Sequence, residues 1–442
     1  MYVILWPMKN RIHLSEISKH VGKTIIVAGF VQTVRNQGKI AFIILRDITA
    51  KAQIVLIKKE LVESLGSVSL ESVIEVTGKV KEAKQAPDGI EIEAETIEIT
   101  SHAMPVPIPI VGKGFEETDQ QIRLDWRWLD LRKPEKALIF KVWTVMEQAF
   151  RNYFIENGFI EIHSPKLTAS ATESGAELFE VKYFDQSARL AQSPQLYKQM
   201  AMAAGFEKVF EVGPVFRANP SFTSRHDTEF TMYDIEMSYI ESHHDLMAEE
   251  EKMVTAMLKA IKEKYGNQIK EYYDREIVVP TMPFPRLTLK EAKNILAKLG
   301  IPNERGDDMS PEEERAICEY VKKEHGHEFV FIHEFPTSVR AFYSMRDDND
   351  PNITKSFDLL WNGLEITSGA QREHRPDRLS KQIQEQGLNL DDFKTYLDFF
   401  KYGCPPHGGF APGPTRMLMK VFNIANVREV TYLYRGVKRL TP

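Results

Sequence analysis

Cysteine is almost absent from this sequence, because Cys318 and Cys404 are the only two among 442 residues. So few thiols exclude a disulfide framework and a cysteine-based zinc site. They suit a reducing compartment, and we expect a cytoplasmic protein.

Long apolar runs are also lacking. The opening "MYVILWP" is apolar, but it is far too short to span a bilayer. It has neither a preceding basic region nor a small-residue cleavage site, so we do not expect a signal peptide. No other segment is a transmembrane candidate, and no membrane partner is expected.

An excess of basic charge is missing too. The formal net charge is −6 and the isoelectric point is near 6.1, which argues against a general polyanion binder. Any nucleic-acid surface must then be a local basic patch on an acidic body. The motifs GxGxxG and GxxxxGK[ST] are absent as well, so the common parallel-sheet nucleotide-binding folds lose support.

Residues 1–104 are rich in short β-type runs separated by Gly, Asn or charged breaks: "KTIIVAGFVQTVR", "KIAFIILRD", "AQIVLI", "SVIEVTGKVKEA" and "GIEIEAETIEIT". The last alternates apolar and polar residues, as a half-buried strand does. Five short strands predict a small closed barrel of the OB type, with some other small β domain as the alternative.

Alternating prolines in "PVPIPIVGKG" end this pattern, and we expect a linker over residues 105–134. A helix should follow from Pro134, because apolar residues recur at helical spacing as far as Phe154. Gly158 is a suitable stop.

Residues 135–442 mix strands and helices without a βαβ rhythm, which predicts an α+β domain on a mainly antiparallel sheet. Helices are expected over 243–266 and 310–326. Strands are expected in the segments "FIEIHSP", "EKVFEVGPVFRA", "TEFTMYDIEMSYI", "EFVFIHEFP", "SVRAFYSMRD" and "KSFDLLWNGLEITSGAQREH".

The stretch "FRANPSFTSRHDTEF" connects two of these strands. Alternation puts Arg217, Asp234 and Glu236 on one face of a hairpin, while Arg225 and His226 lie in its loop. Surface ion pairs would explain this pattern. A polyphosphate site would explain it equally well, because guanidinium groups match phosphate oxygens and carboxylates hold Mg²⁺ or an ammonium group.

Further segments favour a cleft. The segments are "AQSPQLYKQM", "SFDLLWNGLEITSGAQREHR" and the Gly/Pro-rich loop "CPPHGGFAPGPTRMLM". Their basic, acidic and amide side chains sit beside apolar neighbours rather than in a solvated charge run.

With these segments the sequence resembles class II aminoacyl-tRNA synthetases, and within them the aspartyl-tRNA synthetases of the compact archaeal and eukaryotic-like type. The resemblance runs through "RWLDLRKPE", "GFIEIHSPKL", "AQSPQLYKQM", "GLEITSGAQREHR", "YGCPPHGGF" and the terminal "RLTP". It implies an OB-fold anticodon-binding domain at 1–104, a hinge at 105–134 and a class II catalytic domain at 135–442.

The resemblance implies an ATP site. Arg217 is similar to the arginine that binds the α-phosphate and the carboxylate being activated, and Arg416 to the arginine that packs on adenine and reaches the γ-phosphate. These two are the candidate catalytic residues. The remaining candidates for ATP binding are Asn219, Arg225, His226, Glu365 and Gly413.

The amino-acid site is implied in the same way. Lys198 and Arg372 resemble the pair that reads the substrate's side-chain carboxylate, and Gln195 and Asp234 would hold its amino end. Glu173 matches a position in a loop that closes over the amino acid. Ser368 is the last candidate residue for amino-acid binding. An amide in place of the carboxylate would leave a buried cation unpaired, at a cost of roughly 1–3 kcal/mol.

The implied cofactors are ATP and Mg²⁺, with Asp358, Glu365 and Ser368 at the metal positions. In the barrel, Phe42 and Gln53 match positions that stack on and read anticodon bases. The implied partners are L-aspartate and tRNA(Asp), with tRNA(Asn) left open as a second acceptor. The segment ending at Pro165 resembles a dimer interface, so a homodimer is expected.

Departures from the family pattern cluster near the adenine site and the closing loop. They are Asn219 for glutamate, Ser174 for glycine, Thr415 for glutamate and Gly436 for aspartate. Three interpretations stay open: an aspartyl-tRNA synthetase, a paralogue that adenylates aspartate or a relative for another acceptor, and a non-catalytic tRNA-binding protein.

Overall fold

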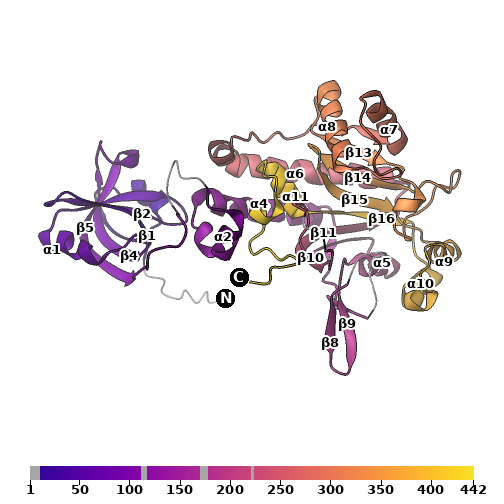
Figure 1. The fold of residues 1–442 in the computed structure, drawn as a ribbon, viewed down its shortest axis with the longest axis horizontal. Coiled ribbons are helices and arrows are strands. Elements are labelled where there is room, and N and C mark those ends of the chain that lie inside the picture. Colours follow the sequence, from indigo (N-terminus) through magenta and orange to yellow (C-terminus); the bar gives the residue numbers. More distant parts are fainter. Residues whose placement is uncertain (1–9, 111–116, 170–177, 221–222) are drawn as a thin grey trace. The chain divides into compact units, whose positions relative to one another are not determined.

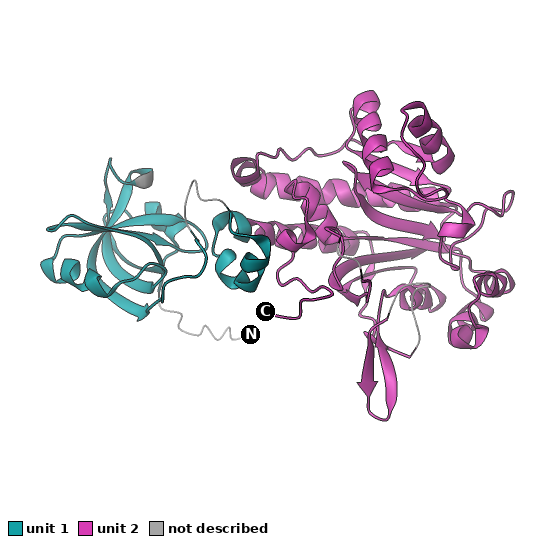
Figure 2. Cartoon of the chain, viewed as in Figure 1, with its two compact units in different colours: residues 1–137, 442 teal, residues 138–441 magenta. Residues whose placement is uncertain are grey.

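The computed structural model describes residues 10–110, 117–169, 178–220 and 223–442. Contacts divide the chain into two units, one of residues 1–137 with Pro442 and the other of residues 138–441 (Figure 2). The boundaries predicted for the hinge stay a prediction. Among the described residues, no helix is both long and apolar enough to cross a membrane.

The first unit contains the predicted five-stranded barrel (Figure 1). It closes in the order β1-β2-β3-β5-β4, and its strands are β1 (Thr24–Asn36), β2 (Ala41–Arg46), β3 (Lys51–Leu56), β4 (Val73–Glu82) and β5 (Ile90–Ser101). Inward-facing residues such as Val27, Ile43, Ile54, Val76 and Ile92 form one apolar core. The OB-type expectation is confirmed.

The alternation along β5 is interrupted. Thr77 of β4 pairs with Thr96, whereas the next residue, Gly78, pairs with Ala94, so Glu95 is the extra residue of a β-bulge. The bulge shifts the inward set from Ile92 and Ala94 to Ile97 and Ile99.

Short helices complete this unit: η1 (Leu14–His20), α1 (Lys59–Ser64), η2 (Leu65–Ser67), η3 (Pro87–Gly89), α2 (Gln120–Asp125) and α3 (Arg127–Asp130). Just after α3, Arg132 lies 3.0 Å from the buried carboxylate of Glu71, which also pairs with Arg46 at 2.9 Å. This part of the predicted linker is therefore anchored on the barrel.

The second unit is built on an eight-stranded sheet in the order β12-β13-β14-β15-β16-β11-β10-β6. Only the β12–β13 and β10–β6 pairs in it are parallel, which confirms the mainly antiparallel sheet. Its strands are β6 (Ile160–Glu161), β10 (Lys208–Phe216), β11 (Glu229–Ser238), β12 (Arg286–Thr288), β13 (Phe329–His333), β14 (Ser356–Trp361), β15 (Glu365–Gln371) and β16 (His407–Pro412).

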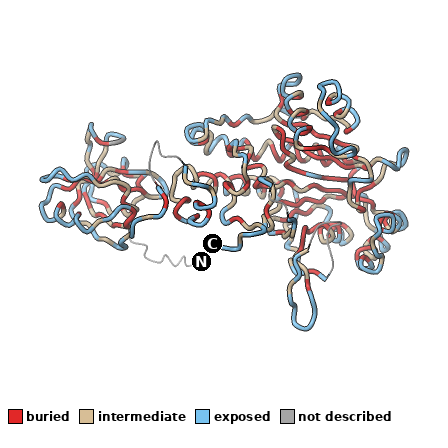
Figure 3. The backbone as a smooth tube through the Cα atoms, in the orientation of Figure 1, coloured by how far each residue is buried: buried red, intermediate tan, exposed pale blue. Residues whose placement is uncertain are grey.

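Helices cover this sheet, and its strands are buried along most of their length (Figure 3). On one face, α4 (Pro134–Glu156), α6 (His243–Tyr273) and α11 (Pro414–Val421) pack in the largest apolar core. On the other, α7 (Leu289–Lys298) and α8 (Pro311–His325) pack over β13 and β14. Further helices of this unit are α5 (Gln195–Ala203), η4 (Thr337–Val339), α9 (Pro376–Glu385), η5 (Leu390–Phe393), α10 (Lys394–Lys401) and α12 (Val427–Val430). A small separate sheet consists of β7 (Leu167–Thr168), β8 (Glu180–Tyr183) and β9 (Gln186–Leu190).

Helix ends follow local capping signals. Gly158, two residues beyond α4, has φ +79°, the left-handed conformation that glycine adopts freely. Ser242 and Asp245 form a capping box at the start of α6. This helix extends to Tyr273, past Gly266 where we expected it to stop, because buried Ile269 keeps its last turns on the core.

Two strand predictions were wrong in extent. "FIEIHSP" yields only the two-residue β6. "SVRAFYSMRD" forms no strand: it has the end of η4 and two isolated bridges, Ser344 to Arg372 and Arg346 to Thr354. In this segment Phe342 packs into a cluster with α9 and α10, so tertiary contacts override the β-type pattern.

The strands β10 and β11 form the expected hairpin, in which Glu211 lies opposite Asp234 and Phe210 opposite Ile235. Phe210 and Ile235 belong to the core that contains α6. The polar face is covered as well, because α5 contacts both strands. Asp234 and Glu236 are therefore buried carboxylates rather than surface ones.

Candidate active site

A cavity of about 370 Å³ lies among β11, β15, β16 and the N-terminal parts of α5 and α11. Asp234 lines it and alternates along β11 with Tyr233 and Ile235 of the core that contains α6, so the cavity lies on the sheet face opposite α6. It is lined by these predicted residues: Gln195, Lys198, Arg217, Asn219, Arg225, His226, Asp234, Glu365, Ser368, Arg372, Gly413 and Arg416.

Two cations and two carboxylates form a buried cluster at one end of the cavity. Lys198 of α5 lies 3.1 Å from Asp234 and 3.4 Å from Glu236, both on β11. Arg372, just after β15, binds Glu236 through Nε at 3.0 Å and Nη2 at 3.2 Å. All four side chains are almost fully buried.

The carboxylates of this cluster differ in their electrostatics. Burial raises the pKa of Asp234, and the nearby Lys198 only partly opposes this. Burial also disfavours ionised Glu236, but Arg372 and Lys198 outweigh it and hold the pKa of Glu236 below its usual value. Lys198 and Arg372, the two cations predicted to read the substrate, therefore already have carboxylate partners. One of these partners is Glu236, which we had placed on the polar face of the hairpin without a role.

Three arginines lie at the other end. Arg217 follows β10, and its Nε donates to the Gln192 carbonyl at 3.4 Å. Arg225 pairs with Glu314 of α8 at 3.0 Å. Arg416 of α11 donates to the Glu365 carbonyl at 2.9 Å and lies 3.2 Å from its carboxylate.

His226 lies in the field of these arginines. Burial, together with Arg416, Arg225 and Arg217, holds the pKa of His226 below its usual value. Its neighbour Asp227 also lines the cavity, and burial raises the pKa of Asp227 to about 7. Such a concentration of guanidinium groups is suited to a polyanion.

The predicted metal residues meet on the β14–β15 hairpin. Asp358 pairs in register with Ser368, and Glu365 lies at the start of β15. Burial raises the pKa of Glu365, with Arg416 opposing and Asp358 adding to the rise. Arg340 donates to both oxygens of Asp358, at 2.9 and 2.6 Å, and to the Ser368 hydroxyl at 3.0 Å.

Arg340 and Glu314 are residues that sequence reasoning missed. Arg340 belongs to the segment that we expected to be a strand, and nothing in its local pattern indicates that it turns back over β14. Glu314 belongs to the helix expected over residues 310–326, for which we predicted no role in a site. Glu173 and Ser174, in contrast, lie outside the described residues.

The structure shows the surroundings of Thr415 and Gly436, two residues that depart from the family pattern. Thr415 lines the cavity and is buried at the start of α11. At Gly436, an added Cβ would lie 2.4 Å from the hydroxyl of Tyr434, so the tyrosine ring occupies the space of a side chain. That hydroxyl donates to the carbonyl of His226 at 3.4 Å.

Phe42 and Gln53 lie in the other unit, on β2 and β3. Both alternate with core residues, which places them on the outer surface of the barrel. The Gln53 amide donates to Glu91 at 3.0 Å. The outer face of these strands is where OB folds bind oligonucleotides.

Comparison with known proteins identifies the family. The model for class II tRNA synthetases (D, K and N) matches residues 119–435, and that for OB-fold nucleic-acid-binding domains matches residues 25–100. A Methanopyrus kandleri protein named aspartate–tRNA(Asp/Asn) ligase is 45% identical over 95% of this chain and 96% of its own length. A Pyrococcus abyssi aspartate–tRNA(Asp) ligase is 42% identical over 97% and 98%.

A solved structure agrees with this result. Asparaginyl-tRNA synthetase from Pyrococcus horikoshii, complexed with asparaginyl-adenylate, superposes with a TM-score of 0.91 at 34% identity over 98% of this chain and all of that one. The resemblance seen in the sequence is confirmed, and the chain belongs to the class II tRNA synthetases of the D, K and N group.

Proposed function

We propose that this chain activates L-aspartate with ATP to form aspartyl-adenylate and transfers the aspartyl group to tRNA(Asp). The observation that carries this proposal is the buried cluster of Lys198, Asp234, Glu236 and Arg372, beside a cavity that Arg217, Arg225 and Arg416 also line. Relatives named as aspartate–tRNA ligases, 45% and 42% identical along nearly the whole chain, support it.

Charge balance favours aspartate as the substrate. Without substrate, two cations face two carboxylates. The substrate ammonium, held by Asp234 and Gln195, would neutralise Asp234 and leave the charge of Lys198 for the substrate's side-chain carboxylate. Arg372 donates to Glu236 through Nε and Nη2, and neither of these bonds involves its Nη1. Nη1 would donate to the side-chain carboxylate of the substrate. Asparagine would leave the buried cluster with an excess positive charge.

The arginines would hold ATP beside the amino acid. Arg217, which directly follows β10, would bridge the α-phosphate and the substrate carboxylate. That carboxylate attacks the α-phosphorus, and pyrophosphate leaves. Arg225 and His226 would contact the outer phosphates, and Arg416 the γ-phosphate. Asn219 and Gly413 line the same cavity, and positioning with fixed charge supplies the catalysis.

The side chains of Asp358, Glu365 and Ser368 fit Mg²⁺, because all three offer the hard oxygen ligands that this ion prefers. Burial, and to a smaller extent the charge of Asp358, raises the pKa of Glu365. Bound there, Mg²⁺ would offset the charge of the ATP phosphates. In the structure, the guanidinium of Arg340 offsets the negative charge of Asp358.

We also propose that the barrel binds the tRNA anticodon, with Phe42 stacking on a base and Gln53 reading one. The family model for OB-fold nucleic-acid-binding domains supports this role. The name of the Methanopyrus kandleri relative includes both tRNA(Asp) and tRNA(Asn), so both acceptors should be assayed. A cytoplasmic location stays a prediction.

A homodimer is proposed from the exposed apolar residues around the sheet edge. Ile160 of the edge strand β6, Ile155 near the end of α4 and Leu167 are each about half exposed. Edge strands with apolar side chains tend to pair with another chain. Light scattering should give twice the monomer mass, and a monomer under dilute conditions would contradict the proposal.

Exchange of pyrophosphate into ATP tests the activity. We expect Mg²⁺-dependent exchange with aspartate and far less with asparagine, followed by acylation of tRNA(Asp). No exchange with any amino acid would refute an enzymatic function. Exchange without acylation of either tRNA would instead identify a paralogue that serves another acceptor.

A further inference from the structure

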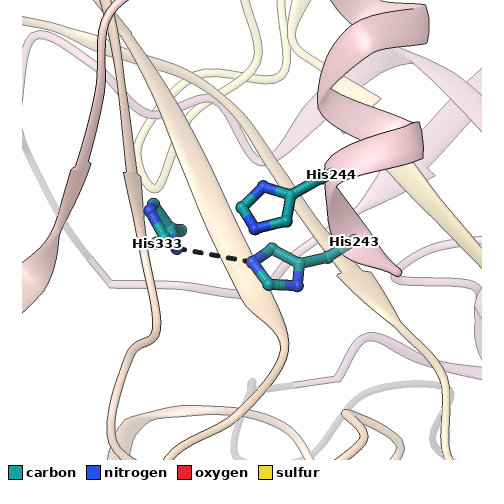
Figure 4. Close-up of side chains that lie close together, drawn as sticks. All are labelled: His243, His244 and His333. Atoms are coloured by element: carbon teal, nitrogen blue, oxygen red, sulfur yellow. Dashed lines mark hydrogen bonds between the residues drawn. The ribbon is translucent and has the colours of Figure 1, made fainter. Parts of the chain in front are cut away.

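Three histidines converge on the sheet face opposite the cavity (Figure 4). His243 and His244 are the first residues of α6, and His333 ends β13. One ring nitrogen from each lies within 4.8 Å of the others. Nε2 of His243 and Nδ1 of His333 are 3.4 Å apart.

Local structure explains this meeting. The capping box of Ser242 and Asp245 starts α6 at His243, which fixes both histidines in its first turn. His333 comes two residues after Phe331, a member of the core that contains α6, so both side chains lie on the face of β13 that this helix covers. Asp358, on the neighbouring strand, lines a separate small pocket on the other face.

The 3.4 Å separation matches a shared metal ion. Zinc binds imidazole nitrogen at about 2.0–2.1 Å in tetrahedral geometry, which places two ligand nitrogens about 3.3 Å apart. His243 is only 6% exposed, and its other nitrogen, Nδ1, has no hydrogen-bond partner within the described part of the chain. Buried polar groups are normally satisfied, so a buried imidazole with one long contact to a second imidazole calls for an explanation.

The surroundings can hold a cation. Neutral imidazole is the form that binds metals, and a histidine with the ordinary pKa of about 6.5 is mostly neutral at pH 7. Asp245, Glu291 and Glu334 contribute negative charge at the cluster, with a Glu334 oxygen 3.5 Å from His333 Nδ1. Arg286 and Lys355 add positive charge, but Arg286 is paired with Glu251 at 2.9 Å.

We propose that His243, His244 and His333 bind one imidazole-preferring transition-metal ion, Zn²⁺ in the first instance, which links the start of α6 to the end of β13. Water or Glu334 would supply the fourth ligand. The site is chemically distinct from the Mg²⁺ site, since hard cations prefer oxygen ligands. This inference does not depend on the proposed function.

The test uses the full chain without a histidine tag, treated with EDTA and then dialysed. Zinc affinity is measured by competition with a chromophoric chelator, and stoichiometry by mass spectrometry of the metal after gel filtration. We expect one zinc per chain and a rise in melting temperature on adding zinc. Cobalt should show the visible absorption bands of a tetrahedral site.

The informative variants are H333Q and H244Q, and H325Q is the control because His325 is exposed at the end of α8. Losing one ligand should weaken zinc binding at least about 100-fold, since second-shell changes alone cost about 10- to 100-fold. H244Q replaces the exposed histidine of the three, so it keeps the test valid if H333Q does not fold. Absence of zinc and cobalt binding by the parent chain, or equal binding by H244Q and H325Q, would overturn the proposal.

Discussion

Arg340 donates two hydrogen bonds to the carboxylate of Asp358, through Nη1 at 2.9 Å and Nη2 at 2.6 Å. The guanidinium therefore occupies both oxygens of a residue proposed to bind Mg²⁺. Metal and arginine must compete for Asp358, or share it with one oxygen each.

Replacing Arg340 with alanine should expose this competition. Without Mg²⁺, the loss of the paired cation should lower the free energy of unfolding by about 1–3 kcal/mol. Added Mg²⁺ should restore part of that loss, because it can now reach both carboxylates. Urea unfolding with and without Mg²⁺ measures this, with Arg378→Ala, a surface ion-pair variant, as the control. Equal Mg²⁺ dependence in parent and variant would contradict the competition.

Arg217→Ala should reduce the rate of pyrophosphate exchange by about 10²–10³-fold, the usual cost of removing one donor to a developing negative charge. The fold should be unaffected, because the hydrogen bond of Arg217 to Gln192 is long at 3.4 Å. Arg189→Ala, which loses an exposed ion pair, is the matched control. If exchange persists at the parental rate, Arg217 does not bind the α-phosphate.

Lys198→Met should impair both stability and aspartate use. It leaves two buried carboxylates short of a cation, at a cost of about 3–5 kcal/mol. The double variant Lys198→Met/Asp234→Asn should regain part of this stability, because it also removes one carboxylate. It should not regain the parental KM for aspartate. An unchanged KM in the single variant would exclude Lys198 from substrate recognition.

A buried carboxyl group on α6 should make stability pH-dependent. Glu250 is fully buried, and neither oxygen has a hydrogen-bond partner among the described residues. Burial raises the pKa of Glu250 to about 8. In the unfolded chain it is about 4.3. The folded state therefore keeps a proton that the unfolded state loses, and this group's contribution to the free energy of unfolding falls as pH rises from about 4.3 to about 8.

Glu250→Gln removes this dependence. Its stability relative to the parent should increase across that pH window and then level off. Urea unfolding at several pH values from about 5 to about 9 checks this. Glu324→Gln, at an exposed position of α8, should run parallel to the parent at every pH. A constant difference between Glu250→Gln and the parent would show that Glu250 ionises normally.

Local patterns predicted much of the fold because they act over a few residues. Apolar periodicity located the barrel strands and α4, and Gly158 marked the end of that helix. Alternation placed Arg217, Asp234 and Glu236 on one face of a hairpin, and β10 and β11 form that hairpin. The same rule failed for residues 338–347, where packing of Phe342 decides the conformation.

The pairing of charges could not be predicted in this way. Arg372 and Glu236 are 136 residues apart, and they meet because β15 and β11 both pair with β16. His243 and His333 are 90 residues apart and meet because the first turn of α6 lies beside the end of β13. We expected the segment with His243 and His244 only to be an amphipathic helix.

The order of the elements, the family and the residue types available for binding nucleotide and amino acid follow from periodicity and motifs, which are local properties of the chain. Which charges neutralise one another follows only from the folded arrangement. Lys198 and Arg372 look like free cations in the sequence, yet burial against Asp234 and Glu236 makes them half of a neutral cluster. Burial and distance set the energy of a charge, and both are properties of the folded chain.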